Sequence, residues 1–189
     1  KHKKYEHPFK KIMTKILYIF LTSFIFLNST DISAHGPSRQ KYIEKIEINA
    51  KPQKVWEVVS KFDKYDWHPD VKSFTADGNE VGAKREIIFK DGSKISHSLE
   101  KLNIEKMMIT WRIVETSQNI LPVNSYSAMV KVTESKENPG KAEITFKSAF
   151  YRGFMGNDPP EHLNDENSKK KVIVFVKKSI DGIKNKLSK

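Results

Sequence analysis

Residues 71–152 alternate between apolar and polar side chains over most of their length. A period of two is typical of strands that bury one face and expose the other. Turn residues interrupt the alternation at Asp91-Gly92 and at Asn138-Pro139-Gly140. The segment therefore predicts a meander of about six antiparallel strands with one apolar face. The runs that share a face are Arg85/Ile87/Phe89, Ile95/His97/Leu99, Met107/Ile109/Trp111/Ile113, Tyr126/Ala128/Val130/Val132 and Ile144/Phe146/Ser148/Phe150.

The segments on either side of the meander predict one further strand and two helices. Residues 41–49 predict a strand with Ile43, Ile46 and Ile48. Pro52 suits the first turn of a short helix, on which Val55, Val59 and Phe62 recur at helical spacing with Trp56 beside them. Residues 164–187 have helical periodicity, with Asn164 as a good N-cap. The apolar face of the sheet must pack against another element, and the apolar stripe of this C-terminal helix can cover it. We expect an α+β fold in which a curved sheet of six to seven strands wraps a long C-terminal helix. The stripe consists of Val172, Phe175, Val176, Ile180, Ile183 and Leu187.

The N-terminal residues predict export. Lysines precede the apolar run 16–27, and the small residues Ser33-Ala34 follow it, which is the pattern of a secretory signal peptide. We therefore expect residues 1–34 to be a signal peptide with an upstream extension, with Met13 as the true start and His35 as the mature N-terminus. Residues 35–40 would be a polar tail, and residues 41–189 a single domain in the periplasm. The alternative is an uncleaved anchor helix, but a run this short is below the roughly 20 residues that a span needs.

The charge of the chain bears on its partners. Without residues 1–34 the chain keeps 28 basic and 21 acidic residues, a net charge of +7. No dense Arg/Lys run with interleaved aromatics occurs, and export also argues against a nucleic-acid partner. Scattered lysines are most often ordinary solvated positions, and the alternative is attraction to an acidic protein or membrane surface. The chain has no cysteine, so it uses neither disulfides nor thiolate ligands. We expect no cofactor and no stable membrane anchor after cleavage.

The segment INAKPQKVWEVVSKFDKYDWHP (residues 48–69), at the front of this element order, resembles the helix-grip superfamily. That superfamily includes START lipid carriers and polyketide cyclases. Lys51 departs from the Ser or Asp helix cap of many members. Further segments resemble the MxaD-type periplasmic proteins of methylotrophic bacteria. These segments are HGP (35–37), WHPDV (67–71), LPVNSYSA (121–128), FYRGFMGNDPP (150–160) and HLNDE (162–166).

The narrower resemblance implies a function and two partners. MxaD-type proteins are thought to assist methanol dehydrogenase and its cytochrome c partner. The resemblance thus implies a periplasmic accessory protein of methanol oxidation that binds both proteins. The basic surface would meet acidic partners.

Two sets of residues are candidates for binding. A cavity beneath the helix could be lined by aromatic residues and a histidine that could orient a ligand; the alternative is plain core packing. The connection between the last strand and the long helix could anchor a partner protein, since Tyr, Phe and Arg are enriched at interfaces; the alternative is that it seals one end of the sheet. The cavity candidates are Trp56, Phe89, His97, Trp111, Tyr126 and Phe146, and the partner-binding candidates are Tyr151, Arg152, Phe154 and Asp158.

Metal binding has only weak candidates. His68 and Asp70 are two residues apart without a third ligand, and the sequence favours the alternative of a rigid loop pinned by Trp67 and Pro69. His35 would offer its amine and imidazole to copper, although Pro37 removes a backbone N–H that the amino-terminal copper motif uses.

The sequence offers little support for catalysis. Gly-x-Ser-x-Gly, HExxH and Gly-rich phosphate-loop motifs are missing from the sequence. We therefore predict a non-catalytic accessory protein. One alternative is a carrier of a hydrophobic small molecule such as a quinone or lipid. A further alternative is a cyclase- or hydrolase-like enzyme with His97 or His68 as the general base.

Overall fold

The computed structural model describes residues 36–188, and these residues confirm the predicted α+β helix-grip fold. The predicted signal peptide and His35 lie outside the described residues. The elements are β1 (Gln40–Ile48), α2 (Pro52–Val59), β2 (Val71–Ala76), β3 (Lys84–Phe89), β4 (Lys94–Asn103), β5 (Met108–Thr116), β6 (Val123–Glu134), β7 (Ala142–Arg152), the 3-10 helix η1 (Glu161–Leu163) and α3 (Asp165–Leu187).

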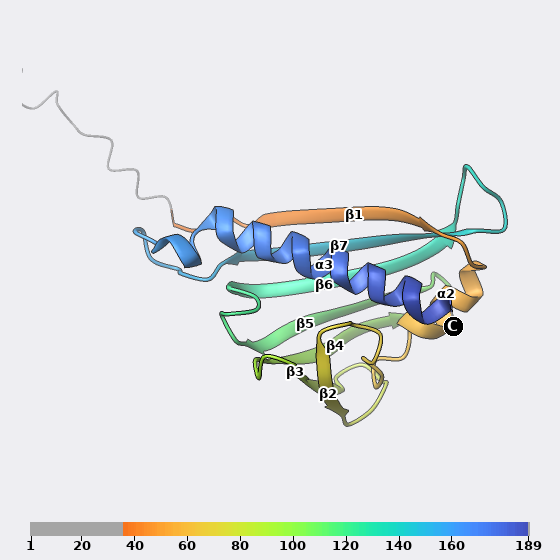
Figure 1. Ribbon diagram of the computed structural model, residues 1–189, viewed down its shortest axis with the longest axis horizontal. Helices are drawn as coiled ribbons and strands as arrows, with labels where there is room; N and C mark the ends of the chain where they lie inside the picture. The colour runs from red at the N-terminus through yellow and green to blue at the C-terminus, as the bar shows by residue number, and fades with distance from the viewer. Residues whose placement is uncertain (1–35, 189) are drawn as a thin grey trace, which may run out of the picture. The chain divides into compact units, whose positions relative to one another are not determined.

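The strands form one antiparallel sheet of seven strands in the order β1-β7-β6-β5-β4-β3-β2. Strands β2 to β7 follow one another as a meander, and β1 joins the far edge by pairing with β7. Helix α3 lies across one face of this sheet, with its C-terminal end beside α2 (Figure 1). Gly92 and Gly140 have φ of 83° and 89°, which confirms the two predicted turns, because glycine takes this backbone conformation without strain.

The alternation predicted from the sequence is the alternation observed. In β7, Ile144, Phe146, Ser148 and Phe150 are each fully buried beneath α3. In β1 the pattern is less regular, since Ile48 is buried whereas Ile43 is 51% exposed on the outer face. The inner face of the sheet and the apolar stripe of α3 therefore make a single core.

The helix ends follow their capping residues. The Asn164 side chain accepts a hydrogen bond from the Asn167 backbone N at 2.8 Å, as the sequence predicts, and Asp165 and Glu166 occupy the first turn of α3. Helix α2 begins with Pro52, and Lys51 provides no side-chain cap. Within residues 36–188, no helix is both long and apolar enough to cross a membrane.

The segment that joins α2 to β2 packs tightly against α3 at a glycine. An ideal Cβ built on Gly182 would lie 1.9 Å from the Trp67 carbonyl oxygen and 3.1 Å from Pro69 Cδ. Only a residue without a side chain lets the helix approach that backbone so closely. Gly182 thus positions the segment that carries Tyr65, Trp67 and His68.

Candidate functional site

A buried arginine is the most unusual polar feature of the interior. Arg85 on β3 is 3% exposed, and its guanidinium carbon lies 4.2 Å from the ring centres of both Phe62 and Tyr65. Its Nη1 donates to the Phe62 carbonyl oxygen at 2.9 Å, and its Nε donates to His97 Nδ1 at 3.1 Å. Within residues 36–188 no ion pair involves Arg85. Burial lowers the pKa of Arg85 to about 10, so the group stays charged at neutral pH without a counter-ion.

His97 on β4 is the partner of this arginine. Its Nδ1 accepts from the guanidinium, so the ring proton must be on Nε2, which has no hydrogen-bond partner among the described residues. Burial, and then the charge of Arg85, lower the pKa of His97 well below its ordinary value. His97 is therefore neutral near pH 7, with one unpaired N–H donor. It is 1% exposed, on the inner face where the alternation predicts it.

Tyr65 and His68 extend the same cluster towards α3. The Tyr65 ring lies 5.9 Å from the His97 ring and 6.1 Å from the His68 ring, centre to centre. His68 Nδ1 accepts from the Asp70 backbone N at 3.2 Å, which leaves a proton on Nε2. Both this atom and the Tyr65 hydroxyl are buried without a hydrogen-bond partner among residues 36–188. The cluster thus holds three unpaired polar atoms and one unpaired positive charge.

The pKa values of these two groups follow from burial. Burial raises the pKa of Tyr65 to about 12, against smaller opposing effects of Arg85 and of the Ser179 hydroxyl. Ser179 is close enough to act on that pKa, but the two hydroxyls do not meet hydrogen-bond geometry, and Ser179 donates to the Phe175 carbonyl instead. Burial likewise lowers the pKa of His68 to about 4, with Asp70 opposing the change. Both groups are therefore neutral at pH 7.

Acidification is expected to destabilise the domain as the pH falls from 6.5 to about 4. His68 and His97 have lowered pKa values, so in this window the unfolded chain binds protons that the folded chain does not. Above pH 6.5 the two histidines are neutral in both states and do not change the free energy of unfolding, and below pH 6.5 that free energy decreases as the pH falls. Urea unfolding at several pH values should show this slope, and a His68→Gln variant should make it shallower. A His162→Gln variant, which changes an exposed histidine, is the control. An unchanged slope in His68→Gln would contradict the lowered pKa assigned to His68.

All six residues predicted to line a cavity are buried. Trp111 lies edge-on to Phe146 at 5.8 Å and tilted to His97 at 6.0 Å between ring centres. The Tyr126 hydroxyl is 2.8 Å from Ser148 Oγ, so its polar atom has a partner. The contacts fit a packed core as well as a cavity wall, and the ligand-sized cavity stays a prediction. The exposed fractions are 4% for Trp56, 1% for Phe89, 1% for His97, 3% for Trp111, 2% for Tyr126 and 0% for Phe146.

An open pocket of about 320 Å³ lies next to the buried cluster, between α3 and the turn that joins β3 to β4. Of the six predicted cavity residues, only Phe89 lines it. Its apolar wall also includes Ile120, Val174 and Phe175, and lysines and aspartates surround the wall. The rings of Phe89 and Phe175 contact the His68 ring, with centre distances of 5.6 and 4.9 Å. The pocket wall is thus the outer layer of the polar cluster.

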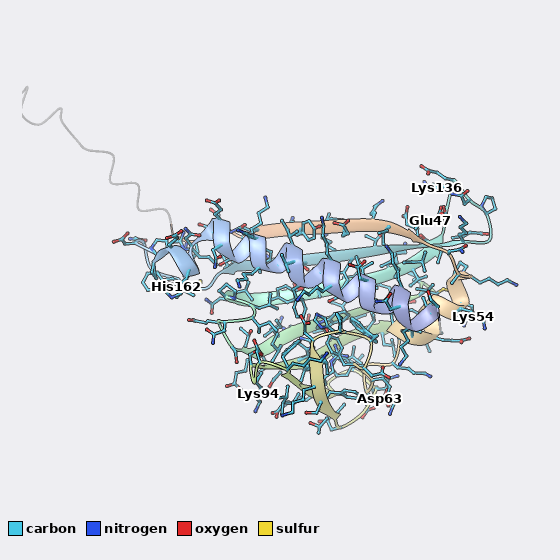
Figure 2. The ribbon with its side chains drawn as sticks, viewed as in Figure 1. Glu47, Lys54, Asp63, Lys94, Lys136 and His162 are labelled. Atoms are coloured by element: carbon cyan, nitrogen blue, oxygen red, sulfur yellow. The ribbon has the colours of Figure 1, made fainter. Side chains whose placement is uncertain are left out.

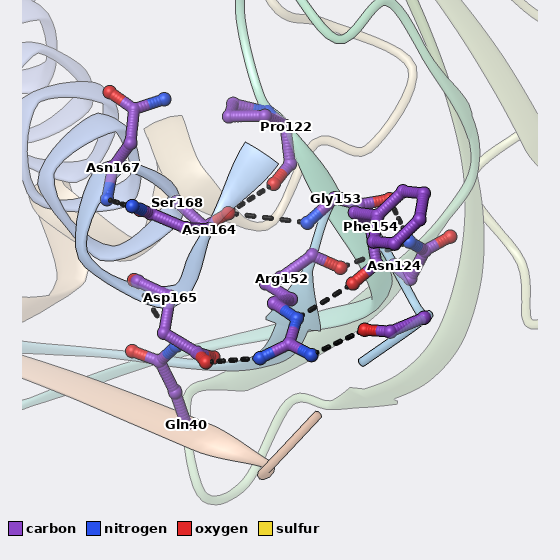
Figure 3. A network of polar contacts seen from close by, with 11 residues as sticks. Gln40, Pro122, Asn124, Arg152, Gly153, Phe154, Asn164, Asp165, Asn167 and Ser168 are labelled. Carbon is purple, nitrogen blue, oxygen red and sulfur yellow. Dashed lines mark hydrogen bonds and ion pairs between the residues drawn. The ribbon is translucent and has the colours of Figure 1, made fainter. Parts of the chain in front are cut away.

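The connection between β7 and α3 is held by Arg152 (Figure 3). The Arg152 side chain donates to the carbonyl oxygens of Phe154 and Gly156 at 2.8 and 2.6 Å, and pairs with Asp165 at 2.7 Å. Gln40 donates to the same Asp165 side chain, which ties in the start of β1. Arg152 is only 6% exposed, so it sets the shape of the connection from within.

Of the other partner-binding candidates, Phe154 and Asp158 lie on this connection at the surface, and Tyr151 is near the end of β7. Phe154 is 37% exposed and its neighbour Met155 is 50% exposed, while Asp158 is exposed and Tyr151 is half-buried. The guanidinium of Arg39 lies 5.9 Å from the Tyr151 ring centre. Figure 2 shows His162, next to this connection, at the opposite end of the sheet from Glu47 and Lys136. The connection thus presents apolar side chains on a firmly held backbone.

A comparison of the sequence with known protein families finds one family that matches nearly all of the described residues. A family described as polyketide cyclase / dehydrase and lipid transport matches residues 39–188. The chain belongs to this family. The residues that match the polyketide cyclase / dehydrase and lipid transport family include every strand and helix described above. No curated protein sequence matches the chain.

Solved structures of the same fold come from several organisms. An uncharacterized protein from Bacillus thuringiensis is 19% identical, with a TM-score of 0.65 over 79% of this chain and all of that one. Protein XoxI from Bacillus cereus is 20% identical, with a TM-score of 0.63 over 78% of this chain and 94% of that one. Norcoclaurine synthase from Thalictrum flavum is 14% identical, with a TM-score of 0.57 over 80% of this chain and 95% of that one. At these identities the likeness shows the fold alone, and the fold hosts both enzymes and other proteins.

Two of the three metal candidates, His68 and Asp70, make other contacts, and the third, His35, lies outside the described residues. His68 is buried in the aromatic cluster, and the Asp70 side chain pairs with Lys178 at 2.6 Å. Residues 36–188 contain no group of three potential ligands that could hold a metal ion.

Sequence reasoning missed Arg85 and Tyr65 as site residues. The alternation did place Arg85 on the inner face with Ile87 and Phe89. A charged residue in an otherwise apolar alternation was the signal that could have identified it.

Proposed function

We propose that this chain is a non-catalytic periplasmic accessory protein of the MxaD type, which binds methanol dehydrogenase and its cytochrome c. The observation that carries the binding role is the connection between β7 and α3, residues 153–160. It exposes Phe154 and Met155, while Arg152 donates to two of its backbone carbonyls and is itself held by Asp165 of α3. A preformed apolar contact surface loses little conformational freedom on binding, which favours affinity. The identity of the partners rests on the sequence resemblance.

The surface charge supports the same proposal. The chain carries a formal net charge of +11, and removal of residues 1–34 would leave +7. A basic protein meets an acidic partner faster, and the association weakens as salt screens the charges. We therefore expect added salt to lower the association rate constant, and the loss of apolar contacts to shorten the lifetime of the complex.

A binding measurement tests the proposal. The purified chain should bind the host's methanol dehydrogenase or cytochrome c saturably at low salt, and more weakly at moderate salt. A Phe154→Ala/Met155→Ala double variant should weaken binding by roughly 30-fold or more if these side chains are central contacts. An Ile104→Ala/Val114→Ala variant is the matched control, because it removes two exposed apolar side chains elsewhere. No binding to either protein at low salt, or equal losses in both variants, would contradict the proposal.

A further inference from the structure

The pocket between α3 and the β3–β4 turn has the size and the wall of a small-molecule site. Its volume of about 320 Å³ lies at the lower end of the range for such sites, roughly 300–1,000 Å³. Phe89, Ile120, Val174 and Phe175 supply an apolar wall. Phe89 and Phe175 are 1% and 6% exposed and form the packed base of the wall, so the apolar surface open to a ligand comes mainly from the half-buried Ile120 and from Val174, which is 47% exposed. A ligand with a flat or short apolar body matches this wall.

The rim of the pocket is positively charged. It carries Lys90, Lys171 and Lys178 against Asp70 and Asp91. Both carboxylates already accept hydrogen bonds, Asp70 from Lys178 at 2.6 Å and Asp91 from the Ser93 backbone N at 2.9 Å. No ion pair within residues 36–188 involves Lys171. Lys90 is in no ion pair among these residues either, but its Nζ donates to the Pro69 carbonyl oxygen at 2.7 Å. Among the rim lysines, Lys171 is therefore the one whose ammonium group is held by neither an ion pair nor a hydrogen bond within residues 36–188.

The polar groups in the interior behind this wall are hydrogen-bond donors and one positive charge. The wall rings of Phe89 and Phe175 pack on His68, whose Nε2–H has no acceptor, and Tyr65 lies behind His68. Beyond Tyr65 is the guanidinium of Arg85, which has only neutral partners. Interactions with such groups act over longer distances in the interior than in water. Both the rim and the groups behind the wall therefore favour a negatively charged ligand.

We propose that this pocket binds a small amphipathic carboxylate, with its apolar body against Ile120 and Val174 and its carboxylate at Lys171. The proposal goes beyond the accessory role, since the pocket and the 153–160 connection consist of different residues. It also differs from a carrier of neutral hydrophobic molecules, because the charge is part of the recognition. It requires no partner protein, so it can fail or succeed independently of the proposed function.

Titration of the purified protein with 2-naphthoate tests the pocket, with 2-naphthamide as the uncharged match. Backbone amide chemical shifts followed by NMR should change saturably around residues 89–91, 119–120 and 171–178. The uncharged 2-naphthamide should bind at least tenfold more weakly than 2-naphthoate. Lys171→Glu should weaken 2-naphthoate binding roughly tenfold by reversing one charge at the site. Lys177→Glu is the matched control, as an exposed lysine of the same helix that does not line the pocket.

A second variant separates the pocket from general charge attraction. Val174 is 47% exposed and lines the pocket, so Val174→Asp places a carboxylate there without disturbing the core. It should abolish 2-naphthoate binding while leaving the melting temperature within a few degrees. The proposal is overturned if 2-naphthoate does not bind, or if the charged and uncharged probes bind equally. Equal losses in Lys171→Glu and Lys177→Glu, or shift changes away from the pocket, also overturn it.

Discussion

An Arg85→Ala variant is expected to lose about 3 kcal/mol of unfolding free energy. The change empties the space between the Phe62, Tyr65 and Trp111 rings, and it leaves the Phe62 carbonyl and His97 Nδ1 without their donor. The relief of a buried, unpaired charge offsets part of this loss. Urea unfolding followed by tryptophan fluorescence would measure it.

Two further variants sharpen this experiment. Arg112→Ala is the matched control, since its side chain is 60% exposed and pairs with Glu100 at the surface, so we expect a change within about 0.5 kcal/mol. Arg85→Met keeps much of the volume but removes the charge, and it should be less destabilised than Arg85→Ala. An Arg85→Ala variant within 1 kcal/mol of the wild type would contradict the role assigned to the cluster.

A Gly182→Ala variant is expected to lose about 2 kcal/mol, although the same change usually stabilises a helix interior. The new Cβ would lie 1.9 Å from the Trp67 carbonyl oxygen and 2.9 Å from the Trp67 carbonyl carbon, both of which are backbone atoms. Either α3 or the 67–69 segment must therefore move. That movement outweighs the gain in helix propensity, because the Trp67 backbone carries His68 and adjoins the packed cluster.

Denaturant unfolding of Gly182→Ala would measure this loss. Gly36→Ala is the control, because a Cβ there meets no atom within 4 Å. A Gly182→Ala variant as stable as the wild type would show that the segment yields easily. A displaced His68 resonance in the NMR spectrum of the variant would support the expected movement.

Periodicity explains which parts of the fold were predictable. Strands with a period of two and a helix with a period of 3.6 each place their own residues, which is why the inner position of His97 and the cap at Asn164 follow from the sequence alone. The cage around Arg85 does not follow from the sequence. Phe62 continues the helical spacing of Val55 and Val59, but α2 ends at Val59, so the prediction that Phe62 belongs to the helix was wrong. Tyr65 lies further along the same connecting segment, which has no repeating pattern.

The clamp formed by Arg152 was hidden for a related reason. An arginine beside aromatic residues in a connection predicts a surface contact, and its composition fits that interpretation. Its actual partners include two backbone carbonyls, which every residue possesses and which therefore leave no mark on the sequence. The exposure of Phe154 and Asp158 is, in contrast, what such a connection normally gives.

The position of β1 has a consequence for how the chain reaches this fold. Strands β2 to β7 pair with their neighbours in sequence, whereas within residues 36–188 β1 pairs with β7 alone, as in the partners Gln40 and Phe150. The first strand must therefore wait until almost the whole domain exists, and such distant pairings form slowly. A chain that ends before β7 leaves both edges of β1 unpaired beside an incomplete sheet. Truncated products should accordingly associate through these open edges, whereas the complete domain covers one of them with its last strand.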